Sequence, residues 1–518
     1  MSTVFDEAVL EERPEIDLST LPALRAEPDP VVVLALDIGT SGTRAALFDR
    51  RGDQIEGSFL HVPAGEYSEL LAGDDVNADA LVASVAQLLD AAVERAEEFV
   101  ARIDYVAAAS FWHSLIGVDD AGRAITPLLG WADTRSSEAV AELRALLPET
   151  ETHARTGCRF HPSYWPAKLL WLKKSSPEVF GRVRRWLSFA DYLYLQLFGN
   201  SATSVSMASA TGLLNQTTSE WDRETLSALH IDESLLPAIV APRRTAGGMS
   251  DEFMLRWPIL ERATWFQAIG DGAANNIGIG CVSRQRVALT VGTSGAMRML
   301  SSRAAPTTLP PELFCYRADR ERVVIGGAVS DGGGLLRWIQ NSLKLDDDAE
   351  LNRLLEEYEP DSHGLTILPF WSGERAPGWS SAATGTIHGL TAATKPLDIA
   401  RAALESVAYR FALIADPLES FAPAASITIA GKVFLLYPFW AQMMADVLGQ
   451  SVELSAFPEA TIRGAALLAL ETIGTIDTLE TIKSEPVRAF VPDMHRHEVY
   501  RRAIERQQDL YRRLQPET

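Results

Sequence analysis

Two segments of this chain carry a short turn sequence rich in groups that can bind anions. Residues 35–42 read Ala-Leu-Asp-Ile-Gly-Thr-Ser-Gly and residues 288–295 read Ala-Leu-Thr-Val-Gly-Thr-Ser-Gly, so six of the eight positions are identical. Glycines at positive φ allow consecutive backbone N–H groups to face one anion, and the Thr and Ser hydroxyls add donors. One copy is a weak signal, because many hairpins contain these residues. Two matching copies predict opposed turns that hold the β- and γ-phosphates of a nucleotide.

Asp37 ends the apolar run that precedes the first turn. A carboxylate in such a place is costly unless it has a partner, and a hydrated Mg²⁺ on the phosphates would supply one. The second copy has Thr290 at the matching position, which indicates one metal-side turn and one turn that binds phosphate alone. A hydrogen-bonded turn aspartate without a metal is the alternative.

Asp271 stands between two glycines directly after an apolar strand predicted over residues 265–269. A carboxylate at such a strand end is open to a cleft and suits a general base that takes a proton from a substrate hydroxyl. Taken alone, Gly-Asp-Gly is more often a plain turn. Its position just before the second copy of the turn sequence favours the catalytic interpretation.

The periodicity around both copies predicts the elements that must position these groups. In the first half, strands are expected at 31–38 and 43–48, a third strand ends at Phe59, and a helix and a strand follow; the expected ranges of these last two are 81–93 and 105–110. The second half is expected to contain a strand at 322–330 and a helix at 333–343. The repetition predicts two similar α/β domains facing each other.

Length and composition limit the class of protein. A chain of 518 residues is long enough for two domains, and its net charge of −22 excludes a nucleic-acid-binding surface. No apolar run is long enough to span a membrane and no signal peptide is recognisable, so we expect a cytoplasmic protein. Residues 1–30 are acidic and punctuated by proline, and we expect an N-terminal tail there.

Further motifs make a resemblance specific. Gly385-Thr-Ile-His-Gly-Leu390 is followed by Asp398-Ile399 and by Ala402-Ala-Leu-Glu405, and residues 368–377 read Leu-Pro-Phe-Trp-Ser-Gly-Glu-Arg-Ala-Pro. From about Val31 to the C-terminus the chain resembles the FGGY carbohydrate kinases. The resemblance implies an α/β fold of two actin-like (ribonuclease-H-like) ATPase domains with an interdomain cleft. The sugar-binding domain would span 31–280 and the nucleotide-binding domain 281–512.

The resemblance also assigns roles. It makes Asp271 the catalytic base and Asp37 the carboxylate that holds Mg²⁺, through water. The residues implied at the phosphates of ATP are Thr40, Ser41, Arg44, Gly292, Thr293 and Ser294.

The adenosine side is expected at two glycine positions of the second half. Gly333 and Gly334 open the predicted helix, where small residues would let the nucleoside lie against the backbone. After the strand predicted at 426–429 the family usually has Gly-Gly, whereas this chain has Ala430-Gly431 and then Lys432. A positive φ at Ala430 would be strained. Lys432 would reach a phosphate or, as the alternative, point into solvent.

Within the family the likeness is greatest to gluconate kinases. It is carried by Trp112-His-Ser-Leu-Ile116, Trp131-Ala-Asp-Thr-Arg135, Thr156-Gly-Cys-Arg-Phe-His-Pro162 and Ser209-Ala-Thr-Gly-Leu213, and Lys168 fits the lysine of a family signature. The candidate substrate-binding residues are Trp112, His113, Asp133, Arg135 and Lys168.

The chemistry of a polyol acid suits these candidates. His113 and Asp133 would pair with hydroxyls, and Arg135 or Lys168 with a carboxylate. The alternatives are a helix-surface Arg135, a solvated Lys168 and a Trp112 that belongs to the core.

The sequence therefore predicts ATP- and Mg²⁺-dependent phosphorylation of a sugar or sugar acid, with gluconate to 6-phosphogluconate as the favoured reaction. A kinase for another sugar such as a ketopentose (xylulokinase-like) and a sugar-binding pseudokinase remain open. So does a nucleotide-driven binding machine of the actin type. The expected partner is a small-molecule sugar, with no nucleic acid and no membrane, and a homodimer is the one assembly considered.

Overall fold

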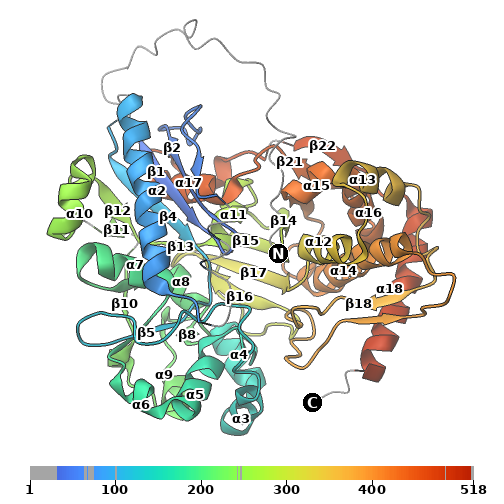
Figure 1. Cartoon of the computed structure of the whole chain (residues 1–518), viewed down its shortest axis with the longest axis horizontal. Coiled ribbons are helices and arrows are strands. Elements are labelled where there is room, and N and C mark those ends of the chain that lie inside the picture. The colour runs from blue at the N-terminus through green and yellow to red at the C-terminus, as the bar shows by residue number, and fades with distance from the viewer. Residues whose placement is uncertain are drawn as a thin grey trace, which may run out of the picture.

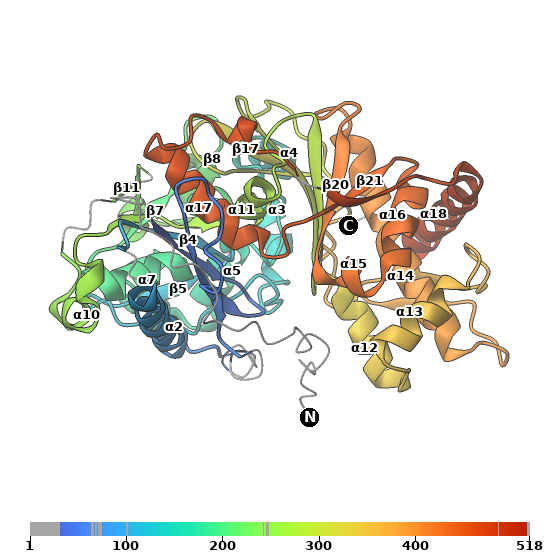
Figure 2. The same ribbon diagram turned by 90° about the horizontal axis from the view of Figure 1, so that it is seen from above.

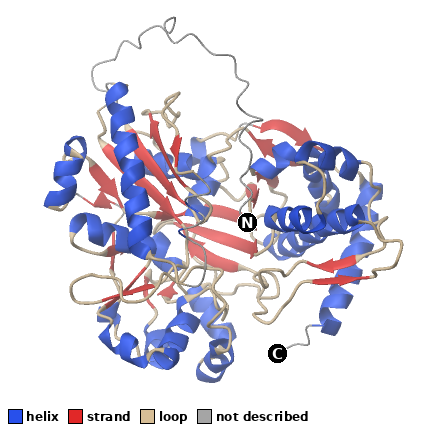
Figure 3. Ribbon diagram, viewed as in Figure 1, coloured by secondary structure: helices blue, strands red, loops and turns tan. Residues whose placement is uncertain are grey.

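Two seven-stranded sheets form the framework of the molecule (Figures 1 and 3). This computed structural model describes residues 32–514 except 64–66, 68–69, 71–74, 100–101, 242, 245–247 and 485. The expected tail at residues 1–30 lies outside the described residues. In the described part of the chain no helix combines the length and the apolar character needed to cross a membrane.

The first sheet has the strand order β11-β12-β4-β1-β2-β3, with β13 also paired to β4, and with its covering helices it forms the first lobe. Strand β1 pairs antiparallel with β2 and parallel with β4, as a hairpin followed by a crossover requires. The strands are β1 (Val33–Ile38), β2 (Thr43–Phe48), β3 (Leu60–His61), β4 (Tyr105–Ser110), β11 (Arg243–Arg244), β12 (Thr264–Phe266) and β13 (Ile269–Gly270).

The second sheet repeats this arrangement in the order β16-β17-β15-β14-β20-β21-β22, and with its helices it forms the second lobe. Here β14 pairs antiparallel with β15 and parallel with β20, which confirms the duplication predicted from the turn sequences. The strands are β14 (Arg286–Val291), β15 (Gly295–Ser302), β16 (Phe314–Arg317), β17 (Arg322–Val329), β20 (Ser426–Ala430), β21 (Val452–Ser455) and β22 (Pro486–Phe490).

Helices cover both sheets. Helix α2 begins after Asn77, whose side chain accepts the backbone N–H groups of Asp79 and Ala80, and it buries an apolar face on the first sheet. The helices of the first lobe are α2 (Ala78–Glu98), α7 (Phe189–Phe198), α8 (Val205–Ser209), α10 (Asp251–Arg256) and α11 (Asp271–Gly278). Those of the second half are α12 (Gly333–Leu343), α13 (Asp348–Glu356), α14 (Pro396–Leu418), α15 (Lys432–Leu436), α16 (Pro438–Leu448), α17 (Ala460–Thr472) and α18 (Met494–Leu514).

An insertion between β4 and β12 has its own hydrophobic core and forms the lower part of the first lobe in Figure 1. It contains β5 (Ile116–Val118), β6 (Arg185–Leu187), β7 (Ala202–Ser204), β8 (Leu214–Asn215), β9 (Glu220–Trp221), β10 (Ala238–Val240), α3 (Ala139–Leu146), α4 (Glu149–Thr156), α5 (Trp165–Ser175), α6 (Pro177–Arg182) and α9 (Arg223–Leu229). Short 3₁₀ turns lie at Glu233–Leu235, Pro258–Leu260 and Leu479–Thr481, and a hairpin of β18 (Thr366–Leu368) and β19 (Thr386–His388) flanks the second lobe.

Helix α17 returns to the first lobe although it comes late in the chain. Figure 2 shows it beside α11 over the first sheet, and it contacts β1 and β4. Close approach depends on two glycines, because a Cβ on Gly278 or on Gly464 would lie 1.8 Å from a carbonyl oxygen of the facing helix. The domain boundary between residues 280 and 281 stays a prediction. Residues 460–472 belong to the second domain by sequence, but they pack against the first lobe.

The lobes are also joined along β16. The backbone N–H of Cys315 donates to the carbonyl of Gly157 (3.0 Å), and that of Arg317 donates to Ser209 Oγ (2.9 Å). Gly157 has φ of +70°, and a Cβ there would lie 1.9 Å from the Cys315 carbonyl. The second lobe therefore contributes a strand to the floor of the interlobe space.

Two expected strands were wrong in their extent. The strand expected to end at Phe59 is only an isolated bridge at Gln54 and the two residues of β3. The reason is that Ser58 Oγ accepts the backbone N–H of Leu47, which replaces a ladder bond. The strand expected at 265–269 is divided into β12 and β13.

Candidate active site

A cavity of about 600 Å³ lies between the two lobes. Both Gly-Thr-Ser-Gly turns open into it, and so do the loops that follow β4 and the start of α11. Its polar lining residues include Asp37, Thr40, Ser41, Arg44, His113, Asp133, Asp271, Thr293, Ser294, Arg298 and Arg375. The structure thus brings together residues that are more than 300 positions apart in sequence.

Each turn is closed by a backbone hydrogen bond from its first glycine, which reaches three residues on in the first turn and two residues on in the second. The N–H of Gly39 donates to the carbonyl of Gly42 (3.0 Å), and the N–H of Gly292 donates to that of Ser294 (2.8 Å). The expectation of positive φ at these glycines was wrong, because none of the turn glycines is among the left-handed residues. At Gly295 the small size serves packing instead, because a Cβ there would lie 2.6 Å from the ring of Phe411.

The expected adenosine glycines Gly333 and Gly334 support the second turn. Their backbone N–H groups donate to the carbonyls of Gly292 (2.8 Å) and Thr293 (3.1 Å). A Cβ on Gly333 would lie 2.9 Å from the carbonyl oxygen of Gly292. These N–H groups are therefore already used by the protein, and contact with a nucleoside stays a prediction.

Asp37 lines the cavity, and three other charged groups act on it. Burial raises its pKa to about 6, although its carboxylate accepts a bond from Arg44 (2.9 Å). Asp271 and Glu459 raise the pKa further by repulsion. These three carboxylates have more negative charge than Arg44 can balance, and carboxylate oxygens suit a hard cation such as Mg²⁺. The bond from Arg44 is also what the alternative of a hydrogen-bonded Asp37 without a metal requires.

Asp271 is the first residue of α11, and one carboxylate oxygen accepts the N–H of Gly272 (2.8 Å). Burial raises its pKa above the ordinary 3.8, opposed by the positive charges of Arg298 and Arg375. The flanking glycines do not make room for a substrate. A Cβ on Gly270 would lie 1.8 Å from the Trp112 ring, so these glycines make room for that indole.

His113 faces the cavity as a neutral acceptor. Its Nδ1 lies 2.7 Å from the carbonyl of Ala210, which can only accept, so Nδ1 carries the proton and Nε2 is the acceptor. Burial lowers the pKa of His113 to about 3. Trp112 is buried beside it and donates its indole N–H to the carbonyl of Ser206 (3.0 Å).

Lys168 does not reach the cavity, which corrects its expected contact with a substrate. Its ammonium is fully buried and donates at 2.8 Å to the carbonyls of His113, Gly130 and Ser163. Those bonds use its three N–H groups. Burial lowers the pKa of Lys168 to about 7, and Asp133 opposes this. Lys168 therefore ties together three loops of the cavity wall, and the solvated alternative was wrong as well.

Arg135 is likewise engaged within the protein. Its guanidinium donates to both carboxylate oxygens of Asp133 (2.7 and 3.1 Å) and lies over the ring of Trp171. Asp133 lines the cavity and Arg135 does not. The structure thus corrects the expectation that Arg135 binds a substrate carboxylate.

Gly431 has φ of +134° and a Cβ position 2.0 Å from the Val291 carbonyl, so this position requires glycine, and its contact with a nucleotide stays a prediction. Ala430 ends β20 and is not among the left-handed residues, so the expected strain there was wrong. The side chain of Lys432 is 70% exposed, with its Nζ 3.7 Å from Glu459. Its alternative orientation toward solvent is the one observed.

Comparison with known families decides the assignment. Residues 32–278 match the FGGY family of carbohydrate kinases, N-terminal domain, and residues 287–472 match the C-terminal domain of that family. The chain belongs to the FGGY family of carbohydrate kinases. Its activity is therefore the ATP-dependent phosphorylation of a carbohydrate.

Relatives of several named activities resemble this FGGY kinase. A gluconokinase of Bacillus subtilis (strain 168) is 29% identical over 465 residues, which cover 87% of this chain and 89% of that protein. A glycerol kinase of Aromatoleum aromaticum is 30% identical over 496 residues, 92% and 98% of the two chains. The crystal structure of gluconate kinase from Lactobacillus acidophilus superposes with a TM-score of 0.83 at 24% identity, covering 94% and 98%. The expected fold of two actin-like ATPase domains is confirmed.

Two arginines of this FGGY kinase were missed by sequence reasoning. Arg298 projects from β15 and Arg375 from the loop before β19, and both line the cavity. A signal was present, because Arg298 interrupts an otherwise apolar strand and Arg375 belongs to the family-like segment 368–377. Glu459, at the start of α17, gave no such signal; it lies 3.3 Å from Arg44.

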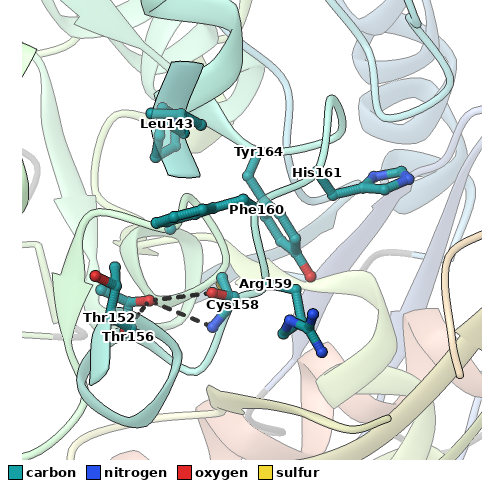
Figure 4. Close-up of a pocket in the computed structure, with 10 residues that line it drawn as sticks. Leu143, Thr152, Thr156, Cys158, Arg159, Phe160, His161 and Tyr164 are labelled. Carbon is teal, nitrogen blue, oxygen red and sulfur yellow. Dashed lines mark hydrogen bonds between the residues drawn. The ribbon is translucent and has the colours of Figure 1, made fainter. Parts of the chain in front are cut away.

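One wall of the site is the segment that leads into α5. Figure 4 shows Phe160, His161 and Tyr164 projecting from it around a small cavity of about 10 Å³, which admits at most one water molecule. His161 donates to the backbone carbonyl of Glu374 in the second lobe (3.0 Å), and the Tyr164 hydroxyl meets that of Tyr316 (2.5 Å). This wall is thus fixed to the second lobe.

Proposed function

We propose that this FGGY kinase transfers the γ-phosphoryl group of Mg·ATP to the terminal hydroxyl of gluconate, giving 6-phosphogluconate. The observation that carries the proposal is the position of Asp271, whose half-buried carboxylate faces the cavity into which both turns open. The similarity to gluconokinases and the segments at 112–116 and 131–135 support gluconate among the sugars.

In this mechanism Asp271 accepts the proton of the attacking hydroxyl, and His113 Nε2 accepts a hydrogen bond from another hydroxyl of the chain. The Thr and Ser hydroxyls of the two turns donate to the phosphates. Asp37 would hold Mg²⁺ through water, and the ion would neutralise charge on the phosphate oxygens. Positioning and charge stabilisation then supply most of the rate enhancement.

The substrate is tested by ADP release with a panel of gluconate, xylulose, ribulose and glycerol. We expect the highest kcat/KM for gluconate. A clearly higher value for a neutral sugar would refute gluconate while leaving the kinase activity in place. Measurable sugar binding with no transfer to any acceptor would instead support the pseudokinase alternative.

The base is tested separately with Asp271→Asn, which keeps the shape of the side chain but cannot take a proton. We expect kcat to fall about 10²–10⁴-fold with ATP and sugar still bound. Turnover within a few-fold of the unsubstituted enzyme would remove Asp271 from this role.

A further inference from the structure

Arg298 and Arg375 differ from the other buried arginines in how they are compensated. Arg401 and Arg410 each form an ion pair with a glutamate, and Arg317 donates from all of its guanidinium nitrogens to carbonyls. Within the described residues, neither Arg298 nor Arg375 has a carboxylate oxygen within 4 Å. Each is no more than 9% exposed.

Most of their donors are also unused. Arg298 donates from Nε to Asn276 (3.1 Å), and Arg375 donates from Nη2 to the carbonyl of Val329 (2.9 Å). Arg375 Nε is buried with no hydrogen-bond partner among the described residues. Burial lowers the pKa of Arg298 to about 10 and that of Arg375 as well. The carboxylates that act on them are Asp271 and, for Arg375, also Asp331, and none of these forms an ion pair with either arginine. A buried cation without a paired counter-charge is costly, and an anion bound in the cavity would compensate both.

The two guanidinium groups lie near Trp131 and near the residue that follows Asp271, and both line the cavity. Arg375 stacks on the ring of Trp131 in the first lobe, with its Cζ 4.4 Å from the centroid. The Nη1 of Arg298 lies 3.0 Å from where a Cβ on Gly272 would be, next to Asp271. The phosphates already have the donors of the two turns. We therefore assign the anion that would bind both guanidinium groups to the acceptor sugar.

The neighbouring residue Glu374 holds the backbone of Arg375 in place. Glu374 is buried, its carboxylate is bound by Arg410 and by the Tyr511 hydroxyl (2.6 Å), and its carbonyl accepts the bond from His161. Both lobes thus fix the backbone that carries Arg375. A planar guanidinium fixed in this way suits a planar carboxylate.

We propose that Arg298 and Arg375 together bind the carboxylate of the acceptor and select acidic sugars over neutral ones. The proposal rests on the proposed function, since it requires an acidic substrate. It takes the place of the role that sequence reasoning gave to Arg135 and Lys168. The substrate class it names is an aldonic acid whose far hydroxyl reaches Asp271.

The test uses the full chain with Arg375→Gln and Arg298→Gln, the matched lysine variants, and Arg320→Gln as an exposed arginine control. The glutamine variants should raise KM for gluconate about 10–150-fold, as expected for loss of a charge-assisted bond, with a much smaller change in kcat. Lysine should restore part of the affinity, and Arg320→Gln should change neither constant.

D-Gluconamide, which lacks the negative charge, supplies a second measurement as a competitive inhibitor. The unsubstituted enzyme should prefer gluconate to gluconamide, and the glutamine variants should lose that preference. A fall in kcat at unchanged KM would overturn the proposal and assign the arginines to the transferred phosphoryl group. An intact preference in all four variants would overturn it too. If the unsubstituted enzyme does not phosphorylate gluconate, the proposed function itself fails.

Discussion

Replacing Lys168 by methionine removes the charge at the junction of three loops while nearly preserving side-chain volume. The carbonyls of His113, Gly130 and Ser163 would then lose the donor that each has at 2.8 Å. A hydrogen bond to a charged group contributes about 1.5–3 kcal/mol, so three bonds set an upper bound of about 4.5–9 kcal/mol. Removal of a buried ammonium returns part of this energy, and we expect a net loss of stability of about 3–5 kcal/mol.

The effect on activity should be unequal for the two substrates. The three carbonyls belong to the loops that carry His113, Trp131 and Tyr164, all of which line the cavity. The turns that face the phosphates are not bonded to Lys168. We therefore expect KM for the sugar to rise about tenfold or more, and KM for ATP to change less.

Urea denaturation and steady-state kinetics measure these effects, with Lys174→Met as the control. Lys174 lies on the same helix, and its exposed side chain is paired with Glu142. Such an exposed pair contributes about 0–1 kcal/mol. The reasoning is refuted if Lys168→Met is within about 1 kcal/mol of the control, or if both KM values rise equally.

Three further predictions concern the base, the metal-side carboxylate and the crossing helix. Because burial raises the pKa of Asp271, kcat/KM should fall on acidification with a midpoint above 3.8, and an acid limb at or below that value contradicts its role. The pKa of Asp37, raised from 3.8 to about 6, favours its protonated form in the folded protein, so this stabilisation is present below pH 3.8 and lost as pH rises through 6. Asp37→Asn should thus be about 1–3 kcal/mol more stable than the native chain at pH 7.5, with a smaller difference at pH 4; denaturation that shows lower stability at pH 7.5 counts against this. Gly464→Ala should cost about 1–3 kcal/mol or more, because its Cβ would lie 1.8 Å from the Ala274 carbonyl, whereas Gly181→Ala has open space around it; equal melting temperatures would disprove the close helix contact.

The duplicated framework was predictable because it depends on local sequence. Apolar runs such as 31–38 followed by a turn indicate buried hairpins wherever they occur, and β1, β2 and β4 lie where they were expected. Helix α12 also has the expected bounds of 333 and 343. The third strand of the first sheet was misjudged because the Ser58 side chain occupies a ladder position, which no periodicity records.

The site was less predictable, since its long polar side chains choose partners that lie far away in sequence. Lys168 and Arg135 were expected to bind the substrate, but whether their side chains face a ligand depends on loops at positions 113, 130 and 133. Arg298 lay within a strand that was read for its apolar residues, and its role depends on the finding that no carboxylate oxygen of the described residues lies within 4 Å of its guanidinium. Which partner such a side chain binds can be learned only from the three-dimensional structure.

The packing of α17 on the first lobe limits how far this lobe can fold while the chain is being translated. Strands β1 and β4 leave the ribosome well before the helix that covers one of their faces, which ends at Thr472. About 200 residues separate α11 from the end of α17, which at 5–20 residues per second takes roughly 10–40 s of translation. Throughout that interval the apolar surface that α17 covers in the folded protein would be exposed on the nascent first lobe. A chain that stalls on the ribosome before residue 460 would therefore be prone to aggregate and would need chaperones.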